Sequence, residues 1–312
     1  SAAEAVMTCS AVAYFFAKQV TEVLDIPVGL VISSWGGSRI ESWMNEKTLA
    51  SIDGVDIEAA RSSKLKMHHR LGCMYDTMLW PVRNFTARGF LWYQGESNIF
   101  NYYCYAPMMT AMVQLWREVW EAPNMPFYYV QIAPHKYKDS QDTDAALLRE
   151  AQIKALEIIP NSGMVSTADI GDEFCIHPPQ KDVVGLRLAT LALTKTYNIC
   201  GLPSTGPTMT KVNYSEGKAI VTFDNASAGL TPAFCNLKGF EIAGADKKFY
   251  PAQAQIIDRT PTVRVWSEQV EQPIAVRYAF RNYVGNISLR NTFGLAAFPF
   301  RTDAWDLSLI HI

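Results

Sequence analysis

A change in pattern near residue 200 constrains the fold more than any other feature of the chain. Before it, short apolar stretches alternate with amphipathic helical stretches; after it, only short alternating stretches occur. Alternation of strands and helices predicts a parallel sheet covered by helices. Short strands separated by turn residues predict antiparallel β-structure. We therefore expect an α/β domain at residues 1–202 and an antiparallel β module at residues 203–306.

The expected elements follow from apolar spacing and turn residues. In the first domain we expect strands at 27–32, 87–93, 125–132 and 163–169, and helices at 5–24, 103–120, 144–159 and 179–197. Ser38 and Glu41 have the spacing of a capping box, which predicts a further helix after the first strand. In the β module we expect strands at 219–223, 239–243, 252–257, 262–266 and 274–280.

Both ends of the chain depart from an ordinary protein sequence. The first residues contain no initiator Met and no charged leader, and a helical pattern begins almost at once. We therefore expect the chain to be a fragment. Residues 307–312 read LSLIHI, which matches the translation of a sequencing-library adapter, so we expect a non-native tail. A short apolar C-terminal strand is the alternative.

Composition excludes several classes of function. Lys and Arg number 28 and Asp and Glu 30, giving a net charge of −2. A near-neutral chain without a basic block argues against a nucleic-acid partner. No apolar run approaches the ~20 residues that span a bilayer. The six cysteines form no C-x-x-C pair, and neither metal-ligand spacing nor a nucleotide-binding glycine pattern occurs, so we expect no metal and no cofactor.

Three segments that follow expected strands hold the polar residues that catalysis requires. In open parallel sheets, ligands bind beyond the carboxyl ends of the strands. The segments are residues 33–38, 94–98 and 169–178. They contain glycine N–H groups, a side-chain amide, carboxylates and a histidine, which are the groups that acyl transfer uses.

His177 is the best single candidate for a general base. It lies in a loop between a strand and a helix, and acidic residues precede it. A surface or helix-capping histidine is the alternative. His135 follows the end of another strand and is a weaker candidate. His68 and His69 lie in a basic stretch that is more typical of a solvated face.

Gln94, Gly36 and Gly37 are candidates for stabilising an oxyanion. The amide of Gln94 can donate a hydrogen bond at the end of its strand, although a structural turn residue would look the same. The Gly36/Gly37 turn can present N–H groups to an anion or can simply be a tight turn. Glu96 suits a fixed structural carboxylate. Trp35 can stack on a sugar or pack in the core.

Several strings together resemble the sialate O-acetylesterase family of SGNH-type hydrolases. They include residues 27–38 (PVGLVISSWGGS), 92–98 (WYQGESN), 169–172 (DIGD) with 176–178 (IHP), 239–244 (GFEIAG) and 299–303 (PFRTD). The resemblance covers about residues 10–305. It implies an SGNH/flavodoxin-like parallel sheet with flanking helices. It also implies a serine esterase that removes O-acetyl groups from sialic acids or related glycans.

On this pattern His177 is the general base, and the glycine turn and Gln94 supply the oxyanion donors. The family's nucleophilic serine lies in a Gly-Gln-Ser-Asn string, and no such string occurs in this chain. We therefore expect the nucleophile in a missing N-terminal part of the same protein, and the chain to be inactive alone. Ser33 and Ser34 lack the G-x-S-x-G elbow that would make either a nucleophile.

The acid that orients the histidine is where this chain departs from the family pattern. Many relatives have Asp two residues before the histidine, where this chain has Cys175. We choose Asp172, with Asp169 and Glu173 as alternatives. A thiol pair of Cys175 with His177 is disfavoured, because side chains two residues apart in one loop rarely work together.

The resulting hypothesis is a carbohydrate O-acetylesterase acting on an O-acetylated sugar without a cofactor. The alternatives are an acetylxylan esterase and a non-catalytic glycan-binding protein on the same scaffold. The resemblance to exported bacterial esterases also implies a periplasmic or secreted location.

Overall fold

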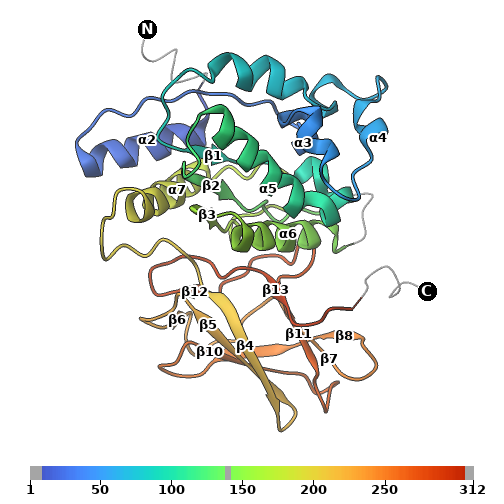
Figure 1. The fold of residues 1–312 in the computed structure, drawn as a ribbon. Coiled ribbons are helices and arrows are strands. Elements are labelled where there is room, and N and C mark those ends of the chain that lie inside the picture. The colour runs from blue at the N-terminus through green and yellow to red at the C-terminus, as the bar shows by residue number, and fades with distance from the viewer. Residues whose placement is uncertain (1–8, 138–141, 306–312) are drawn as a thin grey trace. The chain divides into compact units, whose positions relative to one another are not determined.

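The protein, described by a computed structural model over residues 9–137 and 142–305, divides into two compact units (Figure 1). Unit 1 comprises residues 9–132, 147–167 and 178–204; unit 2 comprises the described residues within 133–146, 168–177 and 205–305. The chain passes from unit 1 to unit 2 for the last time between residues 204 and 205, close to the change in sequence pattern near residue 200. Two loops that leave the sheet of unit 1 belong by their contacts to unit 2.

Unit 1 is built on a three-stranded parallel sheet in the order β1-β2-β3. The strands are β1 (Phe90–Trp92), β2 (Phe127–Val130) and β3 (Ser162–Val165). Every residue of β2 and β3 is buried, as parallel strands covered on both faces require. The predicted parallel sheet with flanking helices is therefore confirmed.

The long helices lie where the sequence predicted them. The structure also contains several short helical turns that the sequence did not predict. The described α-helices are α2 (Ala11–Leu24), α3 (Glu46–Ala50), α4 (Ile57–Arg61), α5 (Tyr102–Val119), α6 (Asp144–Ile158) and α7 (Lys181–Lys195). The short turns are η1 (Ile40–Trp43), η2 (Met67–His69), η3 (Tyr75–Leu79), η4 (Trp80–Val82) and η5 (Glu96–Asn101). Among the residues that the structure describes, no helix is both long and apolar enough to cross a membrane.

Side chains of β2 alternate between two helical layers. The hydroxyl of Tyr129 donates to the carbonyl of Gln152 in α6, with 2.6 Å between the oxygens. The hydroxyl of its neighbour Tyr128 lies 2.7 Å from Thr196 Oγ1, at the end of α7. Because successive strand residues point to opposite faces, α6 and α7 cover opposite faces of the sheet. The α2 helix packs against α7 (Figure 1).

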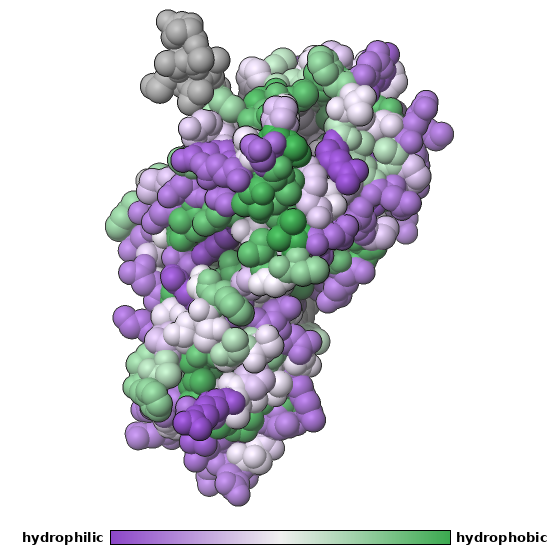
Figure 2. Space-filling model, turned by 90° about the vertical axis from the view of Figure 1, so that its left-hand side faces the viewer, coloured by the Kyte–Doolittle hydropathy of each residue, from purple (hydrophilic) through white to green (hydrophobic). Residues whose placement is uncertain are grey.

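The strand predicted at 27–32 is not formed, and that prediction was wrong. Residues 27–35 carry no strand pairing, and the side chains of Leu30, Val31 and Ile32 are 36%, 53% and 43% exposed. An apolar stretch becomes a strand only when a neighbouring strand satisfies its backbone, and no described strand pairs with this stretch. The view in Figure 2 shows a large apolar area among polar side chains on one face of unit 1.

The helix predicted to start at Ser38 is also wrong. The chain forms only the single 3-10 turn η1, which begins after Arg39. Ser38 Oγ accepts a hydrogen bond from Trp43 Nε1 at 2.8 Å instead of capping a helix. The carboxylate of Glu41 accepts from two asparagines, so it does not close a capping box.

Unit 2 contains two four-stranded antiparallel sheets and one two-stranded sheet, so the predicted antiparallel module is confirmed. The first sheet is β4 (Thr208–Ser215), β5 (Lys218–Asp224), β10 (Thr262–Trp266) and β9 (Gln253–Ile256). The second is β13 (Phe300–Arg301), β11 (Ala275–Tyr278), β7 (Phe240–Ala243) and β8 (Phe249–Pro251). The small sheet is β12 (Arg290–Asn291) with β6 (Leu230–Thr231).

Alternating apolar side chains from both four-stranded sheets form one core. Val221 of β5 pairs with Val263 of β10, and both are fully buried. Ile242 of β7 pairs with Val276 of β11, and both belong to the same buried cluster. This is the packing of two sheets face to face. The tail predicted at 307–312 lies outside the described residues.

Candidate active site

The turn formed by Gly36 and Gly37, called here the glycine turn, is held in place by two side chains from other parts of unit 1. The carbonyl of Gly37 accepts from Ser97 Oγ at 2.8 Å and lies 2.9 Å from His69 Nε2. A carbonyl oxygen can only accept, so Nε2 carries the proton of His69. Gly37 has φ +73°, a left-handed conformation that favours glycine.

The glycine turn leaves donors available to a ligand. Gly36 and Gly37 are both exposed. Within residues 9–137 and 142–305, neither N–H has a hydrogen-bond acceptor. Backbone N–H groups fixed in this way are the kind of donors that stabilise a developing oxyanion. Their assignment as oxyanion donors remains a prediction.

Gln94 lies directly after β1, and its side chain is already fully engaged. Its Nε2 donates to the carbonyl of Ser38 at 2.9 Å and to Asn98 Oδ1 at 2.7 Å. Its Oε1 accepts from the hydroxyl of Tyr105 at 2.9 Å. Gln94 therefore ties β1 to the residue after the glycine turn. To donate to an oxyanion, as predicted, it would have to exchange one of these two amide hydrogen bonds.

Asn98 is a residue that the sequence reasoning missed. It is fully buried, and its Oδ1 also accepts from the Ile40 N–H at 3.0 Å. Its Nδ2 donates to Glu41 at 2.8 Å and to Asn101 Oδ1 at 3.1 Å. The only available signal was its place in the string WYQGESN, four residues after Gln94. This spacing lets the two side-chain amides contact each other, with 2.7 Å between Gln94 Nε2 and Asn98 Oδ1.

Glu96 is half-buried, and within residues 9–137 and 142–305 its carboxylate forms no hydrogen bond with these amides. Burial raises the pKa of the Glu96 carboxyl above its usual value, and the positive charge of Lys181 offsets part of that rise. The residue before it, Gly95, has φ +152°, and a Cβ there would lie 2.6 Å from Ile132 Cγ2. A structural role for Glu96 stays a prediction.

His69, predicted together with His68 to lie on a solvated basic face, also contacts the carbonyl of the glycine turn. The ring of Trp35 stacks on the ring of His68 with 6.1 Å between centroids and 28° between planes. Trp35 is 46% exposed, so its side chain is not part of the core. Burial and the positive charges of Arg39, His68 and Lys66 lower the pKa of His69.

The loop with His177 belongs to unit 2. The His177 side chain is exposed, and Asp172 Oδ1 accepts from the N–H groups of Phe174 and Cys175, both at 2.8 Å. These two bonds lower the pKa of the Asp172 carboxyl. No hydrogen bond joins the side chains of Asp172 and His177 in the part of the chain that the structure describes. Their pairing therefore stays a prediction.

A second loop of unit 2 supports the first. The Asp172 N–H donates to the carbonyl of Pro134 at 3.2 Å, and His135 Nδ1 lies 3.1 Å from the carbonyl of Asp172. A side chain at Gly171 would collide with the Pro134 carbonyl. The candidate His135 thus contacts the backbone of the loop that contains His177.

Both alternative acids are engaged in ion pairs. The buried carboxylate of Asp169 lies 3.0 Å from Arg290 Nη2. The carboxylate of Glu173 lies 3.0 Å from Lys136 Nζ. Asp172 is the candidate for which no ion pair is found among the described residues, which favours it over the other two.

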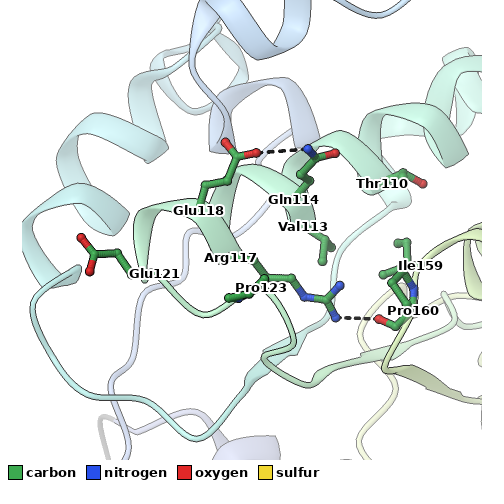
Figure 3. Close-up of a pocket in the computed structure, with 9 residues that line it drawn as sticks. All are labelled: Thr110, Val113, Gln114, Arg117, Glu118, Glu121, Pro123, Ile159 and Pro160. Atoms are coloured by element: carbon green, nitrogen blue, oxygen red, sulfur yellow. Dashed lines mark hydrogen bonds between the residues drawn. The ribbon is translucent and has the colours of Figure 1, made fainter.

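A pocket of about 460 Å³ lies on unit 1, and neither Gly36 nor Gly37 is among the residues that line it (Figure 3). The guanidinium of Arg117 at its wall donates to the carbonyls of Met125 and Pro160, which precede β2 and β3. The pocket is thus at the amino-terminal edge of the sheet, opposite Gln94. No group of three His, Cys, Asp or Glu side chains among the described residues is arranged to hold a metal ion.

Comparisons with known proteins show the family of the chain. Residues 5–194 match the family described as carbohydrate esterase, sialic acid-specific acetylesterase. The chain is 28% identical over 229 residues to sialate O-acetylesterase of Homo sapiens, covering 68% of this chain and 44% of that protein. It is 26% identical over 322 residues to the Mus musculus sialate O-acetylesterase, covering 88% and 59%.

A solved structure extends the likeness to the whole fold. The carbohydrate acetylesterase XAC1771 of Xanthomonas citri superposes with a TM-score of 0.82 at 35% identity, covering 94% of this chain and 65% of that one. The parallel sheet and these matches define a member of a carbohydrate esterase family. The chain belongs to the sialic acid-specific acetylesterase family. It spans about half the length of the mammalian relatives that it matches.

Proposed function

We propose that the protein is a carbohydrate O-acetylesterase that hydrolyses O-acetyl esters of sialic acids or related glycans. The observation that carries this proposal is the glycine turn. Both of its residues are exposed, neither N–H has an acceptor among the described residues, and Ser97 and His69 contact the Gly37 carbonyl. Two fixed N–H donors match the charge that develops on the carbonyl oxygen of an acetyl ester. Membership of the family and the likeness to the Xanthomonas citri acetylesterase support it.

The proposed mechanism is two-step acyl transfer from a serine. The serine oxygen bonds to the acetyl carbon while His177 takes its proton. The bond to the sugar oxygen then breaks, and His177 protonates that oxygen. Water attacks the acetyl-enzyme in the second step, releasing acetate and restoring the serine. Asp172 is proposed to orient His177.

We propose that the nucleophilic serine is supplied by a segment that precedes Ser1, and that the 312-residue chain is inactive alone. Two observations support this. The family's Gly-Gln-Ser-Asn string is absent from the chain. Residues 27–32 also have the composition of a buried strand yet pair with no described strand.

Hydrolysis of 4-nitrophenyl acetate tests these assignments. The 312-residue chain should be inactive, and a chain extended to the natural start should be active. His177→Ala in the extended chain should lower kcat/KM at least about 10³-fold, a typical loss for a catalytic base. Arg259→Ala, at an exposed position that has no assigned role, is the control and should retain activity. Full activity of His177→Ala would refute the role of His177.

The sugar and the location need their own tests. Release of acetate from O-acetylated sialic acid but not from acetylated xylan would support the proposed substrate, and the reverse preference would make the protein an acetylxylan esterase. Sugar binding without hydrolysis by the extended chain would favour a non-catalytic glycan-binding protein. We also propose export to the periplasm or beyond, on the resemblance alone, and cell fractionation tests it.

A further inference from the structure

The guanidinium of Arg39 lies two residues after the glycine turn, over the ring of Phe100. The distance from Arg39 Cζ to the ring centroid is 4.5 Å, and Phe100 is 54% exposed. The buried Nε of Arg39 has no hydrogen-bond partner, and no carboxylate of residues 9–137 and 142–305 forms an ion pair with this side chain. A guanidinium keeps its charge at any ordinary pH, so Arg39 is a permanent cation without a counter-charge here.

Arg39 and Lys66 are two positive charges close to the ring of His69, and both lower its pKa. The local potential beside the glycine turn is therefore suited to an anion. An arginine whose flat face is covered by an aromatic ring keeps its edge available for a carboxylate.

The Trp35–His68 stack gives this cationic area an adjoining flat surface. Trp35 immediately precedes Gly36, and the nearest approach to a Cβ placed on Gly37 is by His68 Nε2, at 3.9 Å. Exposed aromatic rings bind apolar faces of ligands while their polar edges stay hydrated. A ligand bound at the glycine turn would thus meet a flat ring surface and an unpaired cation together.

We propose that Arg39 and the Trp35–His68 stack form a sugar subsite beside the glycine turn, in which Arg39 binds a carboxylate on the sugar and selects acidic over neutral sugars. The assignment rests on the proposed function, because it takes the glycine turn as the place where the ester binds. It identifies the side chains that would discriminate between substrates of the esterase.

Binding to the 312-residue chain tests the subsite without any need for hydrolysis. Isothermal titration calorimetry would compare the methyl glycoside of N-acetylneuraminic acid with methyl β-D-xyloside, which has no carboxylate. The parent chain should bind the acidic sugar more tightly. Arg39→Gln should lower the affinity for the acidic sugar about tenfold, which is the loss expected for one charge-assisted contact. It should leave the affinity for the xyloside unchanged. Arg39→Lys should restore part of the difference.

Arg83→Gln is the matched control, because Arg83 also covers an aromatic ring, that of Trp80, at 4.1 Å from its centroid. It should leave both affinities unchanged, and circular dichroism should show Arg39→Gln folded. Three results would overturn the subsite. They are an equal loss of affinity for both sugars in Arg39→Gln, an unchanged affinity of that variant for the acidic sugar, and no sugar binding by the parent chain. Selective binding by a chain whose extended form never hydrolyses acetate would refute the esterase and keep the subsite.

Discussion

Asn98 uses both the donors and the acceptor of its side chain within unit 1. Its oxygen accepts from the Ile40 N–H and from Gln94, and its nitrogen donates to Glu41 and Asn101. A buried amide satisfied in this way fixes the orientation of each partner. The position of Gln94, and through it that of Ser38 after the glycine turn, therefore depends on one side chain.

Asn98→Ala should lower the free energy of unfolding by about 3 kcal/mol, because it leaves buried donors without partners and removes one donor from the Glu41 carboxylate. Urea denaturation measures the loss. Asn213→Ala, at an exposed position of β4, is the control and should change stability by less than about 0.5 kcal/mol. A loss below about 1 kcal/mol for Asn98→Ala would contradict the importance of this network.

His69 should make stability depend on pH. Its pKa is lowered in the folded protein from the ordinary value of 6.5, so the unfolded chain binds the proton more readily. The stability that this provides is complete above pH 6.5 and is lost as the pH falls from 6.5 towards the folded pKa. Free energies of unfolding at pH 7.5 and 5.5 should differ more for the parent than for His69→Gln. Equal differences would show that His69 contributes nothing.

The junction between β1 and η5 in unit 1 requires a glycine. Gly95 combines φ +152° with a Cβ position 2.6 Å from Ile132 Cγ2 and 2.9 Å from Leu148 Cδ2. Strand and turn meet here so closely that both the conformation and the space exclude a side chain. The turn η5 presents Ser97 to the glycine turn, so this junction also places that contact.

Gly95→Ala should destabilise the protein by at least about 2 kcal/mol, since strain and crowding add. Two further variants separate the causes by thermal or urea denaturation. Gly201 has φ +82° and open space around it, so Gly201→Ala reports backbone strain alone. Gly29 has open space and no left-handed φ, so Gly29→Ala should have little effect. The expected order of loss is Gly95, then Gly201, then Gly29, and any other order would count against this explanation.

The sequence predicted helices and strands well wherever their apolar spacing agrees with their packing in the fold. The helix Asp144–Ile158 and the strand Thr262–Trp266 match their predicted ranges within a residue. The pattern at 27–32 was equally apolar, but pairing depends on a partner elsewhere in the chain, which spacing cannot reveal. Short helices such as α3 and α4 lacked enough turns to show a period.

For the molecule as a whole, unit 2 holds the loop that contains His177. The carboxylate of Asp169 pairs with Arg290 of β12, and the N–H of His135 donates to the carbonyl of Asn282 at 3.1 Å. Sequence reasoning selected this loop because ligands of parallel sheets bind beyond the carboxyl ends of the strands. It could not find these supports, because they join residues more than one hundred positions apart. The same limit hid Asn98 and the contacts of His68 and His69.

Arg290→Gln should loosen residues 168–177 while both units remain folded. It removes the charge that faces the buried carboxylate of Asp169, and an uncompensated buried charge is costly. Hydrogen–deuterium exchange of this segment should become faster in the variant. Arg259→Gln, which alters the exposed pair of Arg259 with Asp258, is the control and should leave the exchange unchanged. Unchanged exchange in Arg290→Gln would refute the support.

The contacts between these loops and the later strands also bear on biosynthesis. Arg281 pairs with Asp142, and the two residues are 139 positions apart in the chain. A ribosome delivers the amino-terminal part first, so the sheet of unit 1 can form while residues 281–290 are still being made. The loop with His177 has to wait for its partners. The protein should therefore acquire its mature loop conformation only near the end of translation.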